Sequence, residues 1–378
     1  MELTFYDIPY FLLFFMFTAF SFFLFNHKEG RKLSNMLLGG FFLAMGLNVI
    51  DGYLLFRGIY DFTPHLAFWL NGLPALFGPL LFLYTKSVLY QDFKLRTKHW
   101  WHAALFLFIF LFFFFIYHVK PVDYKLFFLA MSRTYTGIEI LVGNLVLIIQ
   151  VGLYLFFSFS AIRKYKLAVE SRFSDVKQKQ LSWLRFNLLG YTCIYFLILL
   201  YSAARFIIWE GEPNLFASMT FAFFLLVFIM GVLYRALSQS EVFTELRESD
   251  EHLKKYAYSN LSDTEKQKHF SQLMELMETQ KPWLNSKLTI GDLAAEMDVN
   301  AKTLSQVINE ITGSSFFDFV NRRRVAAAQH LLSNPEDERM TISEIMYQVG
   351  FNSKSSFNSA FKKYTSLTPK EFKLKNTH

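Results

Sequence analysis

The sequence predicts an all-α protein with two unlike parts: an N-terminal bundle of seven transmembrane helices and a C-terminal all-α domain that contains one helical unit twice. Three observations carry this prediction. Seven apolar stretches precede residue 237, positive charge is concentrated in every second loop between them, and one sequence pattern recurs near the C-terminus. The predicted segments are a transmembrane sensor domain over 1–236, a helical juxtamembrane linker over 237–285 and a duplicated domain over 286–378.

The two parts differ in composition. Hydrophobic residues make up 53% of the 378 residues and there are 47 Phe, an excess that is confined to the chain before about residue 236. The single cysteine, Cys193, lies in an apolar run, so the sequence excludes a disulfide framework and a cysteine metal cluster. The first residues lack the positive charges of a cleavable signal peptide, so we expect the first apolar stretch to remain as a membrane span.

Each predicted span is long enough to cross a hydrocarbon core of about 30 Å, which takes roughly 20 apolar residues in a helix. The seven spans are Ile8–Phe25, Asn35–Phe56, His65–Leu89, Trp100–Tyr117, Gly137–Ile162, Trp183–Ile208 and Leu215–Ala236. The third contains Gly72, Pro74, Gly78 and Pro79, so we expect a kink within it.

The distribution of positive charge predicts the orientation of the spans. The first, third and fifth loops hold 13 Lys and Arg residues, whereas the second, fourth and sixth hold 4. Because positively charged loops remain in the cytoplasm, we expect the odd loops inside and the N-terminus outside. An odd number of spans then places the C-terminal domain in the cytoplasm.

Three ionisable residues lie at membrane depth: Asp51, Glu139 and Arg205. Charged groups are costly in a bilayer and commonly serve a function there, so one interpretation is that the three line an outward-facing ligand pocket. The alternative is structural: Asp51 pairs with Arg205, or Glu139 and Arg205 extend to the interface. The sequence leaves both interpretations open.

The net charge of +7 does not indicate a nucleic-acid surface. Residues 1–236 have 20 Lys and Arg against 12 Asp and Glu, whereas residues 237–378 have 18 against 19. The positive excess therefore belongs to the loops between the spans, and any phosphate-binding surface in the C-terminal part has to be local.

The linker is expected to be helical. Residues 237–261 are rich in charge, and Leu246 and Leu253 lie seven positions apart, a spacing that would suit pairing with a second copy of the chain. Ser262 and Glu265 then fit a capping box, and Pro282 ends the helix that follows.

The strongest internal pattern is a duplication. The stretch LTIGDLAAEMDVN (288–300) aligns with MTISEIMYQVGFN (340–352). With one extra residue in the second copy, LSQVINEITGSSFFDF (304–319) aligns with FNSAFKKYTSLTPKEF (357–372). Each copy predicts a capping box, a short helix, a turn near Asp298 or Gly350, and a second helix. This order is typical of a helix-turn-helix unit, and residues 316–332 are expected to form a helix that joins the two units.

A helix of this kind fits the major groove of double-stranded DNA, where amide and hydroxyl groups bind base edges and cations bind phosphates. The predicted outward faces of the two second helices supply such groups: Lys302, Thr303, Ser305, Gln306 and Asn309 in the first copy, and Lys354, Ser355, Ser356, Asn358, Ser359, Lys362 and Lys363 in the second. Polar outward faces are also normal on any surface helix, so this pattern alone leaves DNA binding and a solvated surface open.

Spaced residues in the second copy match a known pattern: Ile342, Ile345, Gly350, Phe351, Ser353, Phe357, Phe361, Lys362, Lys363, Thr368 and Pro369. With them the chain resembles the AraC/XylS family of bacterial transcription regulators over about residues 286–375. The resemblance implies two recognition helices that enter successive major grooves, with the positions above as DNA contacts. The apolar N-terminal part resembles a membrane-bound branch of the family, which implies a multi-pass protein of the bacterial inner membrane.

Two residues depart from the family pattern. Met346 replaces a small Ala, so the spacing of the two helices is expected to shift slightly, and Ser366 replaces the usual Gly after the second helix. If Ser366 adopts a left-handed conformation, it costs about 1 kcal/mol. Arg322, Arg323 and Arg324 resemble the family's structural arginine position, which implies that one bridges the two units and another binds phosphate.

These features favour a regulator that couples a membrane or extracytoplasmic signal to promoter binding. The expected partners are double-stranded DNA, the lipid bilayer, a second copy of the chain in a homodimer, and an unidentified signal ligand or membrane partner. The alternative is a multispan transporter or channel with a regulatory DNA-binding tail, but no repeat relates one set of spans to another. Catalysis, a metal and a cofactor are not expected, because zinc-protease, esterase, kinase and Walker motifs are missing from the sequence.

Overall fold

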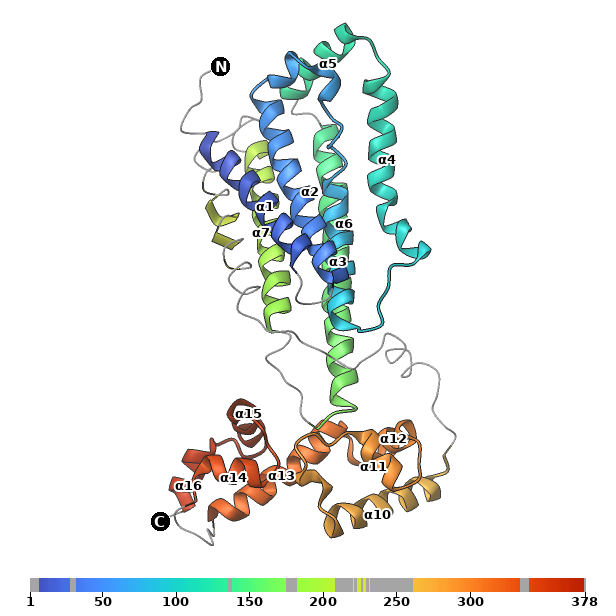
Figure 1. Ribbon diagram of the computed structural model, residues 1–378, viewed down its shortest axis with the longest axis vertical. Helices are drawn as coiled ribbons and strands as arrows, with labels where there is room; N and C mark the ends of the chain where they lie inside the picture. The colour runs from blue at the N-terminus through green and yellow to red at the C-terminus, as the bar shows by residue number, and fades with distance from the viewer. Residues whose placement is uncertain are drawn as a thin grey trace. The chain divides into compact units, whose positions relative to one another are not determined.

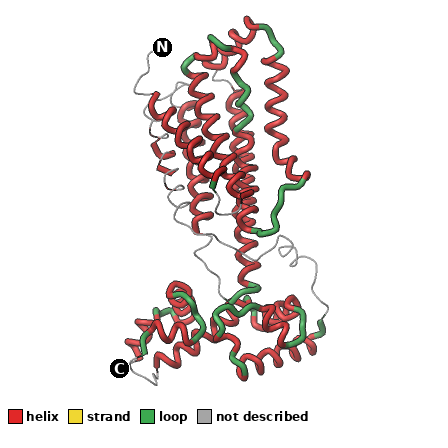
Figure 2. The backbone as a smooth tube through the Cα atoms, in the orientation of Figure 1, coloured by secondary structure: helices red, strands yellow, loops and turns green. Residues whose placement is uncertain are grey.

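The computed structural model describes residues 7–27, 32–134, 138–174, 182–207, a few positions between 220 and 231, 261–333 and 340–376. Over these residues the protein is all-α, as the sequence predicts (Figures 1 and 2). The chain divides into two compact units. The first comprises residues 1–162 and 181–248, and the second comprises residues 163–180 and 249–378.

The first unit is a bundle of apolar helices (Figure 1). Its helices are α1 (Ile8–Asn26), α2 (Lys32–Phe56), α3 (Pro74–Leu89), α4 (Ala104–Phe113), α5 (Val122–Thr134), α6 (Ile138–Glu170) and α7 (Ser182–Ile207), and the last turns of α6 belong to the second unit. Helix α2 packs against both α1 and α3. Buried phenylalanines fill the contact between α1 and α2, where the rings of Phe17 and Phe42 stack with their centroids 5.9 Å apart.

Helices occupy most of the predicted spans. The predicted and observed bounds agree within a few residues for α1 and α2, and for the start of α6 and both ends of α7. The fourth span is a composite: a 3₁₀ segment (Thr97–Ala103), α4, and a π-helical turn (Phe114–His118). Four helices in the described ranges are long and apolar enough to cross a membrane: Ile8–Asn26, Lys32–Phe56, Thr97–His118 and Gly143–Glu170. The predicted seventh span falls largely outside the residues that the structure describes.

The predicted helix over His65–Leu89 is wrong in its first part. Helix α3 begins at Pro74, and the chain before it forms 3₁₀ turns at Ile59–Asp61 and Pro64–Leu66. Phe68 has a positive φ of 66°, a value that a continuous helix does not allow. Proline suits the first turn of a helix because its missing N–H has no partner there, so Pro74 marks the start of α3, and Pro79 lies inside the helix.

Helix α5 was not predicted, because its charged residues resemble those of a loop. The side chain of Lys125 is nevertheless buried: its Nζ lies 3.2 Å from His65 Nδ1 and 5.9 Å from the ring centre of Tyr117. Tyr117 Oη in turn donates a hydrogen bond of 2.7 Å to the carbonyl oxygen of Pro64. The aromatic cluster thus packs α5 against the 3₁₀ turns that precede α3.

The second unit contains two small helical cores (Figure 1). Its helices are α10 (Asp263–Thr279), α11 (Ile290–Glu296), α12 (Ala301–Thr312), α13 (Phe316–Ser333), α14 (Ile342–Gln348), α15 (Lys354–Thr365) and α16 (Pro369–Asn376), with a 3₁₀ turn at Pro282–Leu284. One core joins α10, α11, α12 and the first half of α13, and the other joins the second half of α13 with α14, α15 and α16. Helix α13 is therefore the shared element, which confirms the predicted connecting helix.

The predicted capping boxes are present. At Ser262, Thr289 and Thr341 the hydroxyl accepts a hydrogen bond from the backbone N–H three residues later, and the acidic side chain at that position accepts one from the cap's N–H. The first of these starts α10, whose Leu273 and Met277 are buried in the first core. The part of the predicted linker that is described is thus packed into the second unit.

Candidate nucleic-acid interface

Helices α12 and α15 are built in the same way. Asn300 Oδ1 accepts a hydrogen bond from the N–H of Lys302, and Ser353 Oγ accepts one from the N–H of Ser356. The caps are offset by the one extra residue of the second copy. At the other end, Gly313 and Ser366 occupy equivalent left-handed positions, with φ of 65° and 63°. Each helix is 12 residues long, so α12 and α15 present equivalent faces.

The apolar side of each helix fixes which face is free. Leu304, Val307 and Ile308 are buried on α12, and Phe357 and Phe361 are buried on α15. On α15 the opposite face is open to solvent: Lys354, Ser355, Asn358, Ser359, Lys362 and Lys363 are exposed, whereas Ser356 is half-buried beside its cap. These side chains lie on the predicted outward face of the helix.

The corresponding face of α12 is more restricted. Asn309 is exposed, and Lys302, Thr303, Ser305 and Gln306 are half-buried. Two amides of this face bond within the helix: Gln306 Nε2 donates to Glu310 Oε1 at 2.9 Å, and Asn309 Nδ2 donates to the carbonyl oxygen of Ser305 at 2.7 Å. Glu310 also pairs with Lys266 of α10 at 3.0 Å. These contacts hold the amide groups in defined positions on the helix.

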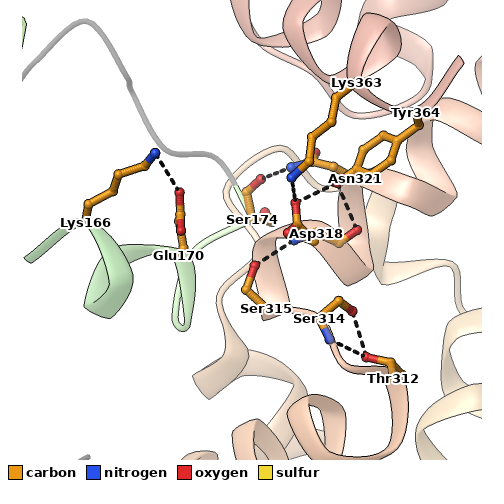
Figure 3. A network of polar contacts seen from close by, with 10 residues as sticks. All are labelled: Lys166, Glu170, Ser174, Thr312, Ser314, Ser315, Asp318, Asn321, Lys363 and Tyr364. Carbon is orange, nitrogen blue, oxygen red and sulfur yellow. Dashed lines mark hydrogen bonds and ion pairs between the residues drawn. The ribbon is translucent and has the colours of Figure 1, made fainter. Parts of the chain in front are cut away.

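Lys363 is not a free cation. Its Nζ lies 2.6 Å from Asp318 Oδ1 of α13, and Tyr364 Oη donates to the same oxygen at 2.7 Å (Figure 3). Burial by itself would raise the pKa of Asp318, but the hydrogen bonds from Lys363 and Tyr364 outweigh it and leave that pKa below its ordinary value. Burial and the nearby carboxylate raise the pKa of Tyr364. The network joins α15 to the connecting helix.

The three consecutive arginines have different surroundings. The guanidinium carbon of Arg322 lies 5.7 Å from the ring centre of Tyr364. Arg323 lies over the ring of Phe319 and pairs with Glu278 at 3.4 Å. Arg324 is fully buried and spans the junction of the two helix-turn-helix units.

Its position makes Arg324 the central polar residue of that junction. Its Nε donates to the carbonyl oxygen of Trp283 at 2.7 Å, and its Nη2 donates to that of Asn285 at 2.8 Å. Its guanidinium carbon lies 5.6 Å from the ring centre of Phe351, which belongs to the second core. One side chain thus contacts the loop that precedes α11 and the turn that precedes α15.

The residues predicted at membrane depth are only partly described. Asp51 is buried and accepts a hydrogen bond of 2.6 Å from Tyr60 Oη, where Tyr60 belongs to the 3₁₀ turn after α2. Glu139 lies in α6 and Arg205 in α7, but their side chains fall outside the described residues. An ion pair that the sequence did not suggest joins Arg57 to Asp7 at 3.5 Å.

The two departures from the family pattern fit the structure. Met346 is buried in the second core, and its carbonyl oxygen accepts a hydrogen bond of 3.0 Å from the N–H of Phe351, so the larger side chain is packed inside the unit. Ser366 has a φ of 63°, which confirms the left-handed position on which its predicted strain depends.

Two features of this region have no local pattern in the sequence. Asp318 is an acid in the first turn of α13, a common place for one, and only the fold brings it to Lys363. The segment Arg172–Ser174, which follows α6, packs against the residues around Leu288. A third feature, a capping box of Thr368 and Glu371 at the start of α16, is a local pattern that the sequence analysis missed.

Two helix-turn-helix units that share one connecting helix define a class of DNA-binding domain, and comparisons with known proteins identify its type. A family model described as a helix-turn-helix domain matches residues 293–375. The chain is 30% identical over 88 residues to the Msm operon regulatory protein of Streptococcus mutans, a match that covers 23% of this chain and 31% of that protein. Residues 293–375 form a helix-turn-helix domain of the AraC type.

Other known proteins match over a similar length. The transcriptional regulatory protein HptR of Staphylococcus aureus is 26% identical over 98 residues, which are 26% of this chain and 37% of that protein. A solved structure, the C-terminal domain of the two-component response regulator yesN from Fusobacterium nucleatum, is 27% identical and has a TM-score of 0.25, covering 28% of this chain and 98% of that chain. The chain spans about a third of the length of the curated relatives that it matches.

Proposed function

We propose that this chain is a membrane-anchored transcription regulator that binds double-stranded DNA through α12 and α15. The observation that carries the proposal is the equivalence of these two helices, which have matching caps, matching left-handed ends and polar outward faces. The Streptococcus mutans and Staphylococcus aureus relatives are by name an operon regulator and a transcriptional regulator. We propose a regulatory and non-catalytic role for this chain as well.

The exposed groups divide into two kinds of contact. Asn358 offers an amide that can bind a base edge through two hydrogen bonds, and Gln306 and Asn309 do so once their bonds to Glu310 and Ser305 are exchanged. Lys354 and Lys362 offer ammonium groups suited to phosphates. On this proposal the amides choose the sequence, and the lysines supply affinity that depends on salt.

Exposed apolar side chains support a membrane location for the first unit. Trp101, Phe108 and Phe115, along the composite fourth helix, are 82%, 65% and 62% exposed, and α1 and α6 expose Phe15 and Phe156 in the same way. Soluble proteins rarely expose so continuous an apolar surface, whereas a bilayer covers it with lipid. We propose that this unit crosses the bacterial inner membrane with the C-terminal domain in the cytoplasm, as the charge of the loops predicts.

The signal enters this proposal through the first unit. Asp51, buried beside Tyr60 near the end of α2, is the described residue best placed for a role in sensing, and Glu139 and Arg205 remain proposed partners in it. A homodimer is also proposed. Its predicted pairing segment, 237–261, lies almost entirely outside the described residues.

DNA selection with the full-length protein in lipid nanodiscs tests the function. We expect a randomised duplex library to yield one enriched sequence, bound with strong salt dependence. Lys362→Ala should weaken all duplexes alike, and Asn358→Ala should alter base preference. Lys268→Ala, which removes an exposed charge from α10, is the matched control. The proposal fails if no sequence is enriched.

A further inference from the structure

The segment Arg172–Ser174 is bound to the helix-turn-helix domain by backbone hydrogen bonds. The N–H of Ser174 donates to the carbonyl oxygen of Leu288 at 3.1 Å, and the N–H of Ile290 donates to that of Arg172 at 2.9 Å. Between them, Phe173 and Thr289 form an isolated antiparallel bridge. The segment thus pairs with the chain immediately before α11 through one isolated antiparallel bridge.

The side chains of the junction complete the attachment. Ser174 is 1% exposed, and its carbonyl oxygen accepts a hydrogen bond from Asn321 Nδ2 at 3.1 Å (Figure 3). The same oxygen accepts one from Arg324 Nη1 at 3.3 Å. Its hydroxyl donates to the carbonyl oxygen of Leu288 at 2.8 Å and lies 3.1 Å from Arg324 Nη2. Asn321 and Arg324 are themselves 1% and 0% exposed. The segment therefore supplies hydrogen-bond acceptors to two buried side chains of the helix-turn-helix domain, Asn321 and Arg324.

This site lies where the two helix-turn-helix units meet, so its contacts affect both of them. Arg324 also binds the carbonyl oxygens of Trp283 and Asn285 and lies over Phe351, so the same guanidinium contacts the segment and both helix-turn-helix units. If the segment left, Asn321 and Arg324 would lose acceptors in a buried place. Arg324 would then be held less firmly, and the relative arrangement of α12 and α15 would lose a contact that stabilises it.

We infer that the junction of the two helix-turn-helix units is a docking site for the loop that follows α6, and that the docked segment Arg172–Ser174 holds α12 and α15 in the arrangement that binds DNA. This inference rests on the proposed function for its effect on DNA. Helix α6 ends at Glu170, two residues before the segment, and its last turns belong to the same compact unit as the helix-turn-helix domain. The device is a coupling between two parts of one chain.

A disulfide tests the docking without any use of DNA. Phe173 and Thr289 form a bridge pair flanked by hydrogen bonds, an arrangement in which the two Cα atoms are about 4.5 Å apart, within the range that a disulfide spans. Phe173→Cys with Thr289→Cys, combined with Cys193→Ser, should therefore oxidise to one intramolecular disulfide in full-length protein in nanodiscs. The control pair is Leu167→Cys with Thr289→Cys, which should stay reduced. No disulfide in the first pair, or equal disulfide in both, overturns the docking.

Substitutions test the effect on DNA. Ser174→Pro removes the N–H and the hydroxyl that bind Leu288, and we expect it to weaken binding of the selected duplex about five-fold or more. Ser171→Ala is the control, because within the part of the chain that the structure describes the hydroxyl of Ser171 bonds to its own turn, at Ala168. Because Thr289→Cys also removes the hydroxyl that caps α11, the reference for the disulfide-linked protein is the same variant in reduced form, and oxidation should not weaken its binding. Unchanged binding by Ser174→Pro, with the disulfide formed, overturns the coupling.

The two proposals fail differently. If the disulfide forms but no duplex is bound selectively, the docking stands and the proposed function is wrong. If a duplex is selected but the disulfide does not form, the function stands and the docking is wrong.

Discussion

Gly350 lies directly against the backbone of Trp283, so that a Cβ at position 350 would be 2.7 Å from the carbonyl oxygen of Trp283. The same Cβ would be 2.7 Å from the carbonyl oxygen of Leu284, and Gly350 has a φ of 87°. The turn of the second helix-turn-helix unit is thus packed onto the 3₁₀ turn (Pro282–Leu284) that precedes the first helix-turn-helix unit. Glycine is required there by conformation and by space.

Gly350→Ala should destabilise the second helix-turn-helix unit by about 2–3 kcal/mol, because alanine has an unfavourable energy at this φ and its Cβ meets two backbone oxygens. The measurement is hydrogen exchange of the α14 and α15 amides in full-length protein in nanodiscs. Asp298 is the control: it occupies the equivalent turn with a φ of 51°, so Asp298→Gly should stabilise by up to about 1 kcal/mol. Equal effects at the two positions would contradict this account.

Ser366→Gly should stabilise α15 by about 1 kcal/mol, since Ser366 ends the helix in a left-handed conformation that glycine adopts freely. The reverse substitution, Gly313→Ser, should cost α12 a similar amount. Exchange rates of the last amides of each helix give both values, and a change of the same sign in both variants would refute the prediction.

Arg324→Lys should destabilise the junction by about 3 kcal/mol, because a single ammonium group cannot serve the buried acceptors that now bind three guanidinium nitrogens. Arg322→Lys should cost at most about 1 kcal/mol, since Arg322 is exposed and its contact with the ring of Tyr364 is one that a lysine ammonium group can also make. Urea unfolding followed by exchange of the α11 and α13 amides distinguishes the two. Similar losses in both variants would show that Arg324 has no special place.

Asp318→Asn should raise the affinity for DNA, because it removes a negative charge and releases the ammonium group of Lys363. The slope of log affinity against log salt should become steeper by about one. The control is Asp263→Asn, which releases Lys266 of α10 from one of its two acidic partners, Asp263, and leaves the other, Glu310 of α12. Lower affinity in Asp318→Asn would indicate that the ion pair is needed to position α15.

The same carboxylate predicts a dependence of stability on pH. The pKa of Asp318 is lowered in the folded protein, so its contribution to stability is present above the unfolded value of about 3.9 and is lost as the pH falls through the folded value. The protection of the α13 and α15 amides, measured relative to their intrinsic exchange rates at each pH, should therefore fall below about pH 4 in the wild type. Asp318→Asn should lack this component, and an identical acid profile in the two proteins would contradict the assignment.

The C-terminal domain could be predicted closely because its determinants are local. The capping boxes at Thr289 and Thr341 need only residues three apart. The left-handed position of Ser366 was expected from its place directly after the second helix, where the family pattern has Gly. The outward face of α15 follows from helical spacing alone. Such features are fixed by neighbours in the sequence, so one sequence suffices to find them.

The parts that were missed depend on distant contacts. Ser174 and Leu288 are 114 residues apart in the chain, and Asn321 lies 147 residues from Ser174, so no local pattern could join them. The pairing of Lys363 with Asp318 likewise needs the fold. The late start of α3 and the presence of α5 depend on how an aromatic cluster around Tyr117 packs the intervening turns.

The most direct test of the central claim is the footprint of the full-length protein on its selected duplex. We predict protection of two major-groove segments on one face of the DNA, about one helical turn apart. Gln306→Ala should relax base preference in one segment, and Asn358→Ala should relax it in the other. A single protected segment, or a loss of preference in the same segment for both variants, would contradict the claim that α12 and α15 are a pair of recognition helices.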